Sequence, residues 1–255
     1  LSEKSFKTRL IHGVTGSGKT EVYFEAMENA MEQGGSVLFL VPEVALAPQT
    51  VSRLRKRFSY EKVVVWHSHL SSGERVDAWK SLITGNSRIA VGARSAIFAP
   101  LSKLRLIIVD EEHESAYKQE DTPRYHARDI AVVRAKHTDS LCLLGSATPS
   151  LESINNVRKG KYGISHLRNR VDNRELPLIH LVDMRREADK TRTLPILSQS
   201  LIEALRERCA NREQSILFLN RRGFNTTMLC PDCGHVETCK NCSIALTYHK
   251  TDGYL

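Results

Sequence analysis

The chain has 255 residues, 41% of them hydrophobic, and 37 Lys and Arg against 29 Asp and Glu give a formal net charge of +8. This apolar content excludes a wholly disordered chain, and the length suits one or two domains. No apolar run reaches the roughly 18 residues that cross a bilayer, and no signal-peptide segment opens the chain, so we expect a cytoplasmic protein with no membrane partner. The net positive charge suits a polyanionic partner, although a charge of this size is also ordinary for a chain of this length.

Short apolar segments rich in β-branched residues alternate with longer segments of helical periodicity. The expected strands are Thr8–His12, Ser36–Val41, Lys62–Trp66, Arg88–Gly92, Arg105–Asp110, Leu141–Gly145, Leu178–Val182 and Ser215–Asn220. The expected helices are Lys19–Gln33, Leu46–Phe58, Gly73–Thr84, Ala127–His137, Leu151–Lys159 and Leu197–Ala210. This alternation predicts βαβ units and a parallel α/β sheet. Residues 106–109 are apolar throughout, which favours helices on both faces of the sheet.

The polar and basic stretch Lys161–Pro177 interrupts this alternation, and we interpret it as a linker. We therefore expect a first domain over residues 1–175, the start of a second over 176–229, and a small cysteine-rich region over 230–255. The chain ends without a visible closing element, so we expect a piece of a longer protein.

The clearest motif is a glycine-rich segment that fits the pattern G-x-x-x-x-G-K-[ST] and lies between an expected strand and an expected helix. The N–H groups of such a loop bind nucleotide phosphates. Lys19 is expected to reach the β- and γ-phosphates, and the Thr20 hydroxyl to bind Mg²⁺. The candidate ATP-binding residues are Gly13, Val14, Thr15, Gly16, Ser17, Gly18, Lys19 and Thr20.

An acidic segment, Asp-Glu-Glu-His, ends another expected strand, at the edge where an open α/β sheet binds its ligands. Asp110 is the candidate magnesium ligand, and Glu111 is the candidate base for the attacking water. His113 is expected to sense the γ-phosphate, and Lys19 completes the candidate catalytic set. A solvated charge run is the alternative for this segment taken alone. The Asn-Lys-x-Asp motif usual in a GTPase is absent from the sequence.

Small hydroxyl residues follow the next expected strand, in Ser146-Ala147-Thr148. Such residues can bond to the acidic segment and report whether the γ-phosphate is present. The alternative is a simple turn whose hydroxyl caps the helix that begins near Leu151.

Together, the phosphate loop, residues 110–113 and residues 146–148 resemble motifs I, II and III of superfamily 2 helicases. Val41–Gln49 and Val91–Pro100 look like motifs Ia and Ib, and Phe218–Phe224 looks like the opening of the second helicase lobe. The cysteines inside that lobe make the chain similar to the PriA family of bacterial replication-restart helicases. The resemblance covers nearly the whole chain. It implies a RecA-like first lobe with helices on both faces of its sheet, the start of a second lobe, and a small zinc region.

The resemblance also implies an ATP-driven DNA helicase that moves 3′ to 5′ on single strands and acts in replication restart and primosome assembly at stalled forks. The implied partners are ATP, single-stranded and forked DNA, primosome proteins and single-strand binding protein, in the bacterial cytoplasm. One alternative is a motor of the same superfamily that moves on duplex DNA without separating strands. The other is a non-enzymatic platform that binds zinc and DNA, against which the intact phosphate loop and acidic segment argue.

In such motors the Ia and Ib segments face the DNA strand. The candidate DNA contacts are Pro42, Glu43, Gln49, Arg94 and Ser95. Arg94 is the strongest candidate for a phosphate, with a structural salt bridge as its alternative. Contacts to phosphates position a strand without reading its sequence, as a motor requires.

The segment Tyr117–Arg128 mixes aromatic and basic side chains, and aromatic faces stack on bases. It resembles the loop that links DNA contact to hydrolysis in related helicases, and an ordinary surface loop is the alternative. The candidate coupling residues are Arg124, Tyr125, His126, Ser146 and Thr148.

Two C-x-x-C pairs, Cys230 with Cys233 and Cys239 with Cys242, have the spacing of zinc ligands. Four thiolates suit tetrahedral Zn²⁺. In the family, eight cysteines hold two zinc ions in interleaved pairs. The resemblance therefore leaves open whether these four form one site, two half-sites or nothing ordered.

By the same resemblance, three parts of the family lie outside this chain. They are the N-terminal DNA-binding region, an upstream glutamine segment that reads adenine, and the later motifs that supply an arginine finger. Such a finger contributes about 10³–10⁵ in rate. We therefore expect the chain to bind nucleotide, to hydrolyse it poorly and not to unwind a duplex by itself.

Overall fold

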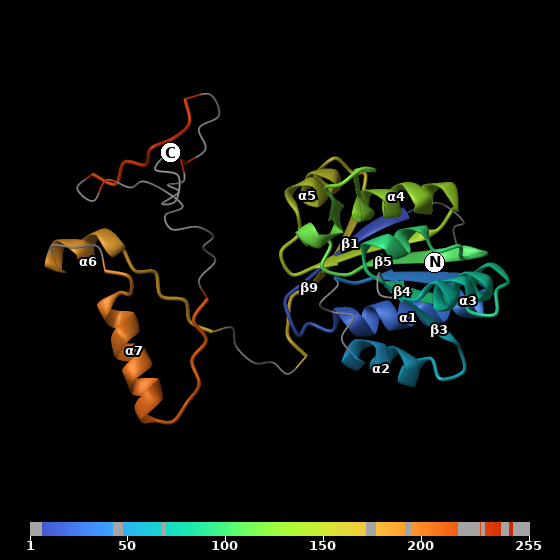
Figure 1. Cartoon of the computed structure of the whole chain (residues 1–255), viewed down its shortest axis with the longest axis horizontal. Helices are drawn as coiled ribbons and strands as arrows, with labels where there is room; N and C mark the ends of the chain where they lie inside the picture. The colour runs from blue at the N-terminus through green and yellow to red at the C-terminus, as the bar shows by residue number, and fades with distance from the viewer. Residues whose placement is uncertain are drawn as a thin grey trace. The chain divides into compact units, whose positions relative to one another are not determined.

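The computed structural model describes residues 7–42, 48–67, 70–171, 177–191, 195–218, 230, 233–240 and 245–246, except the side chains of 48–50 and 188–191. The chain divides into two compact units, Leu1–Glu175 and Leu176–Leu255 (Figure 1).

A seven-stranded sheet, parallel at every pairing, forms the centre of the first unit (Figure 1). Its strands lie in the order β3-β4-β2-β5-β8-β1-β9. Their bounds are β1 Lys7–Gly13, β2 Ser36–Leu40, β3 Val63–Trp66, β4 Ile89–Gly92, β5 Leu104–Val109, β8 Leu141–Ser146 and β9 Gly163–Leu167. The six strands expected before residue 146 are thereby confirmed to within one residue at each end. A separate antiparallel hairpin joins β6 (Lys118–Gln119) to β7 (Tyr125–His126).

Helices cover both faces of this sheet, as predicted. On one face lie α1 (Lys19–Glu32) and α2 (Pro48–Arg57), and on the other α3 (Ser72–Ile83), α4 (Ala127–His137) and α5 (Leu151–Arg158) (Figure 1). Two short 3₁₀ helices are η2 (Arg94–Phe98) and η3 (Ser115–Tyr117). Among the described residues, no helix has the length and apolar character needed to cross a bilayer.

The apolar residues 106–109 lie on β5 and are buried on both faces of the sheet. Leu106 and Ile108 point into the core beneath α1, whereas Ile107 and Val109 point into the core beneath α4. Successive side chains of a strand alternate between faces, so a strand buried on both sides must be apolar at every position.

The register of the inner strands gathers the motifs at one edge of the sheet. Val109 pairs with Leu144, and Gly145 pairs with Ile11. Because these strands are parallel, the segments that leave their carboxyl ends leave side by side. The phosphate loop, the acidic segment and the Ser146 loop therefore meet at this edge, as βαβ topology requires.

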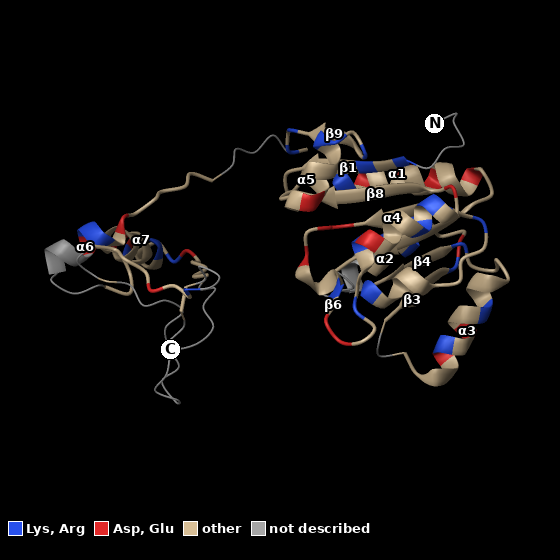
Figure 2. Cartoon of the chain, turned by 90° about the horizontal axis from the view of Figure 1, so that it is seen from above, with Lys and Arg blue, Asp and Glu red and all other residues tan. Residues whose placement is uncertain are grey.

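The interpretation of Lys161–Pro177 as a linker is wrong for its first part, because β9 pairs in parallel with β1. Strand β9 lies at the edge of the sheet, and its side chains are half-buried or exposed. It therefore lacks the apolar run that marks the inner strands. Basic residues surround it, which Figure 2 shows in blue.

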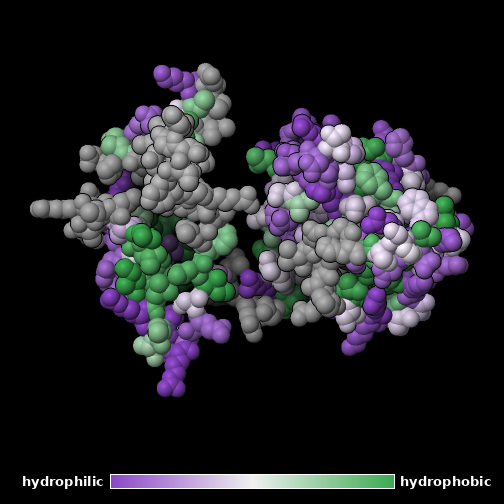
Figure 3. Space-filling view, viewed as in Figure 1, coloured by the Kyte–Doolittle hydropathy of each residue, from purple (hydrophilic) through white to green (hydrophobic). Residues whose placement is uncertain are grey.

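In the second unit, two expected strands are wrong. Leu178–Val182 forms no strand, and neither do residues 215–218, while residues 219–220 lie outside the described part. The apolar side chains of these segments are exposed, and Figure 3 shows hydrophobic residues in green on the surface of this unit. A strand requires a neighbour to pair with, and apolar content alone does not supply one.

The described part of the second unit instead contains two helices. The first, α6 (Met184–Thr191), was not predicted. The second, α7 (Gln199–Ala210), confirms the expected helix, and the Ser198 hydroxyl caps it by accepting a hydrogen bond from the Leu201 N–H at 3.2 Å. No apolar side chain in this part of the unit is buried.

Candidate active site

The phosphate loop connects β1 to α1 and is shaped by its glycines. Gly16 and Gly18 have φ values of 80° and 86°, a region that side chains rarely adopt. A Cβ on Gly13 would lie 2.4 Å from the Ser17 hydroxyl oxygen. The glycine pattern therefore corresponds to a tight loop whose backbone is free to approach a ligand.

Lys19 is the first residue of α1, and its side chain is almost fully buried. Its Nζ donates to the Gly13 carbonyl at 2.9 Å and lies 3.8 Å from Glu111 Oε1. A cavity of about 400 Å³ opens here, lined by Thr15, Gly16, Ser17, Gly18, Lys19, Thr20, Glu21, Arg53, Asp110, Glu111 and Val171. The structure thus brings the predicted phosphate loop and acidic residues to the walls of one cavity.

Asp110 follows β5, and two buried tyrosines hold it. The Tyr23 hydroxyl donates to Asp110 Oδ1 at 3.0 Å, and the Tyr117 hydroxyl donates to the Asp110 carbonyl at 2.7 Å. Burial raises the pKa of the Asp110 carboxyl above its usual range, and the Tyr23 hydrogen bond opposes that rise. The next residue, Glu111, has a φ of 45°. A non-glycine residue in this region stores about 1 kcal/mol or more of strain, which is typical of functional sites.

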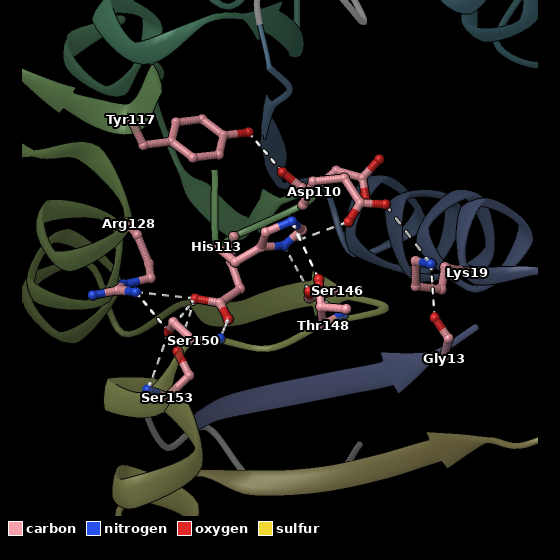
Figure 4. Close-up of polar contacts among 12 residues, drawn as sticks. Gly13, Lys19, Asp110, His113, Tyr117, Arg128, Ser146, Thr148, Ser150 and Ser153 are labelled. Carbon is pink, nitrogen blue, oxygen red and sulfur yellow. Dashed lines mark hydrogen bonds and ion pairs between the residues drawn. The ribbon is translucent and has the colours of Figure 1, made fainter. Parts of the chain in front are cut away.

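His113 connects the acidic segment to the Ser146 loop (Figure 4). Its Nδ1 lies 2.8 Å from Ser146 Oγ and 3.6 Å from Glu111 Oε2. Its Nε2 lies 3.3 Å from Thr148 Oγ1, and the Thr148 N–H donates to Ser146 Oγ at 2.9 Å. The predicted contact between these two motifs is therefore present, and it reaches the carboxylate of the candidate base.

Glu112, which sequence reasoning left without a role, is fully buried. Its carboxylate lies 3.1 Å from Arg128 Nη1, and it accepts hydrogen bonds from the Ser150 N–H and from both the Ser150 and Ser153 hydroxyls. Arg128 lies on α4 and Ser153 on α5, so these contacts join both helices to the acidic segment; Figure 4 shows the two side chains. Only the position of Glu112 inside the acid run signalled it, because Arg128 lies sixteen positions away in the chain.

The candidate DNA contacts fall in different places. Arg94, on η2, donates through Nη1 to the carbonyls of Ala116 and Lys118, so its described partners are backbone oxygens rather than a carboxylate. It lines a hollow of about 430 Å³ beside β6. Ser95 is exposed and Pro42 is half-buried, while Glu43 and the Gln49 side chain lie outside the described residues.

The candidate coupling residues lie on or beside the hairpin. Arg124 Nε donates to the Glu120 carbonyl at 3.0 Å, and the Tyr125 ring packs edge-on against Phe98, with ring centroids 5.2 Å apart. His126 Nδ1 is buried without a hydrogen-bond partner among the described residues. Burial lowers the pKa of His126, and the nearby Arg128 guanidinium lowers it further.

A family model described as DEAD/DEAH box helicase matches residues 3–157. The chain belongs to the DEAD/DEAH box helicase family. The acidic segment, the Ser146 loop and every residue that lines the cavity except Val171 fall inside the matched region. The helicase domain of Pyrococcus furiosus Hef has a similar fold, with a TM-score of 0.51 and 18% identity over 82% of this chain and 52% of that one.

Relatives within the helicase family give a closer comparison. The chain is 47% identical over 250 residues to the replication restart protein PriA of Bacillus subtilis, covering 98% of this chain and 31% of that protein. It is also 47% identical over 256 residues to PriA of Chlamydia trachomatis serovar D, covering 100% of this chain and 34% of that protein. The chain therefore spans about a third of the length of the curated relatives it matches.

In this helicase chain, the cysteine region is described only in part. The turn from Cys230 to Gly234 is closed by a hydrogen bond from the Gly234 N–H to the Cys230 carbonyl at 2.9 Å. Gly234 has a φ of 73°, which suits the tight turn. In the described residues no three potential metal ligands gather, and Cys242 lies outside them.

Val171 also lines the cavity, although it was not among the predicted site residues. Val171 follows β9, its N–H donates to the Gly16 carbonyl at 3.0 Å, and it lines the cavity. It belongs to the stretch interpreted as a linker, and nothing in its local sequence signals the phosphate loop. Only the pairing of β9 with β1 brings it there.

Proposed function

We propose that a protein containing this chain is an ATP-dependent DNA helicase of replication restart. The observation that carries the proposal is the convergence of Lys19 and Glu111, whose charged atoms lie 3.8 Å apart at the walls of one cavity. A phosphate-binding cation and a carboxylate at that separation suit a γ-phosphate and the water that attacks it. Membership of the helicase family and 47% identity to PriA proteins support the choice of a DNA motor over other ATPases.

In this proposal, the loop N–H groups and Lys19 bind the phosphates of ATP. Asp110 and the Thr20 hydroxyl fit Mg²⁺, because both supply hard oxygen atoms at the cavity wall. Bound there, Mg²⁺ neutralises charge on the phosphate oxygens. Glu111 accepts the proton of the attacking water.

The contact from His113 to Ser146 and Thr148 is proposed to report hydrolysis to the DNA side. Its bonds span the ends of β5 and β8, so a shift of Glu111 on loss of the γ-phosphate reaches the Ser146 loop. Arg94, Ser95, Pro42 and Gln49 are proposed to contact DNA, and Arg124, Tyr125 and His126 to couple that contact to hydrolysis. Movement from 3′ to 5′ and action at stalled forks in the bacterial cytoplasm rest on the family and the PriA relatives.

Zinc and partner proteins complete the proposal. The thiolates of Cys230, Cys233, Cys239 and Cys242 fit Zn²⁺ by donor type, and the tight turn at Gly234 fits a C-x-x-C ligand pair. We also propose contact with primosome proteins and single-strand binding protein, by analogy with the PriA relatives. The domain boundaries proposed are a first lobe over 1–175, a second beginning over 176–229, and the zinc region over 230–255.

The test is ATP hydrolysis by the full-length protein, with and without single-stranded DNA. We expect strong stimulation by DNA, and loss of hydrolysis by at least about 10²-fold in Glu111→Gln with ATP binding retained. Glu32→Gln, at the far end of α1, is the matched control and should behave as the parent. If DNA does not change the rate of hydrolysis, the protein would be assigned only as an ATPase and not as a DNA motor. Hydrolysis without displacement of a strand from a forked duplex would favour a duplex translocase.

A further inference from the structure

Tyr23 lies four residues after Lys19 on α1, with its side chain fully buried. Its ring packs edge-on against Phe39, with centroids 5.8 Å apart, and its hydroxyl reaches Asp110 Oδ1 at 3.0 Å. A buried phenol usually finds one hydrogen-bond partner. Here that partner is the carboxylate proposed to bind the cation.

Gly145, on β8, makes room for this hydroxyl. A Cβ at Gly145 would lie 1.5 Å from the Tyr23 hydroxyl oxygen and 2.7 Å from its Cζ. Both contacts are impossible, so any side chain at this position would displace Tyr23 from Asp110. The absence of a side chain at Gly145 therefore allows the Tyr23 hydroxyl to reach Asp110. Residues from α1 and β8 and the residue that follows β5 together form this contact.

The backbone of Asp110 is fixed independently of Tyr23. Its N–H donates to the Leu40 carbonyl at 2.9 Å, and its carbonyl accepts from the Tyr117 hydroxyl at 2.7 Å. The two tyrosines thus act on different parts of one residue. Tyr117 holds the main chain, whereas Tyr23 holds one carboxylate oxygen.

The Tyr23 hydroxyl carries a single proton, which it donates to Oδ1 of the Asp110 carboxylate. With Oδ1 engaged in this way, Oδ2 is the atom left for a cation at the cavity wall.

We propose that Tyr23 is a positioning residue, which orients the Asp110 carboxylate for the divalent cation that accompanies the nucleotide. The proposal rests on the proposed function. Tyr23 itself does not line the nucleotide cavity. Its hydroxyl therefore acts on cation affinity alone, and residues that orient metal ligands typically contribute 10- to 100-fold to that affinity.

The test is nucleotide binding by full-length Tyr23→Phe, measured with a fluorescent ADP analogue across a Mg²⁺ titration. We expect the half-saturating Mg²⁺ concentration to rise about 10- to 100-fold, while binding in EDTA stays within about twofold of the parent. Tyr117→Phe is the matched control, because it removes a buried hydroxyl that bonds to the backbone of the same residue. It should leave the Mg²⁺ requirement within about twofold.

A double-mutant cycle separates positioning from general loosening of the site. In an Asp110→Asn background, Tyr23→Phe should add no further change in the Mg²⁺ requirement. An unchanged Mg²⁺ requirement in Tyr23→Phe, or equal losses with and without Mg²⁺, would overturn the inference and leave the proposed function intact. Absence of nucleotide binding by the parent would overturn both.

Discussion

The Glu112 carboxylate and the Arg128 guanidinium lie 3.1 Å apart, with 0% and 8% of their side chains exposed. Ser150 and Ser153 occupy the remaining acceptor positions of the carboxylate. A buried charge pair with its hydrogen bonds satisfied is costly to break, because either partner alone is an uncompensated charge.

Removal of Glu112 should therefore destabilise the first unit. We expect Glu112→Ala to lower the free energy of unfolding by about 3–5 kcal/mol, measured by urea denaturation of the chain. Glu152 supplies the control, since its carboxylate lies 4.0 Å from the same guanidinium but its side chain is 71% exposed. Glu152→Ala should cost less than about 1 kcal/mol. Similar losses in both variants would contradict the assignment of Glu112 as the buried partner.

His126 should make the stability of the chain depend on pH. Burial and then Arg128 lower the pKa of its imidazole, and the carboxylates of Asp129, Glu112 and Glu152 oppose this to a smaller extent. Below the unfolded pKa of about 6.5, the unfolded chain binds the proton more readily. The contribution of His126 to the free energy of unfolding should therefore be fully present above about pH 6.5. It should be lost as the pH falls from that value toward the lowered pKa of the folded state. His126→Gln should show a shallower fall between about pH 7 and 5, and an unchanged slope would count against this account.

Arg94 should contribute to the salt dependence of DNA binding. If it contacts one phosphate, Arg94→Ala should reduce the slope of log K against log salt by about 0.7 on single strands. The measurement is fluorescence anisotropy with labelled oligonucleotides and the full-length protein. Arg55→Ala, on the exposed part of α2, is the control and should keep the parent slope. A slope unaffected by Arg94→Ala would limit the role of Arg94 to its hydrogen bonds with the Ala116 and Lys118 carbonyls.

Zinc binding should depend on the C-x-x-C cysteines and not on Cys209. We expect the full-length protein to contain zinc by atomic emission, and Cys233→Ser to lower the zinc content. Cys209→Ser, on an exposed turn of α7, should retain it. A parent protein purified without chelators yet free of zinc would show that the spacing of these cysteines was misinterpreted.

The sequence pattern predicts the inner strands of the sheet and the phosphate loop. Residues 106–109 of β5 are all apolar and buried, and two glycines of the phosphate loop, Gly16 and Gly18, have positive φ values that favour glycine. Strand β9 has neither signal, because an edge strand tolerates polar residues such as His166. Leu178–Val182 has the apolar signal without a partner strand in the described residues, and so the prediction failed there.

Within the site, the motif residues that line the cavity could be predicted, whereas Val171 and the residues that lie behind the cavity could not. Lys19 and Asp110 belong to motifs whose spacing is fixed along the chain. Tyr23 and Arg128 act through space, on partners 87 and 16 positions away. Contacts of that kind follow from strand order, which the sequence of one chain does not state.

The order β5-β8-β1 has a mechanical consequence. The strand that carries the acidic residues and the strand that carries the phosphate loop are not neighbours, since β8 lies between them and bonds to both. The carboxyl end of β8 therefore lies between the end of β5, which leads to Asp110, and the end of β1, which leads to the phosphate loop. We therefore expect a change in the distance between Glu111 and Lys19 to require a movement of Gly145 and Ser146. A Cβ at Gly145 would already lie 1.5 Å from the Tyr23 hydroxyl oxygen.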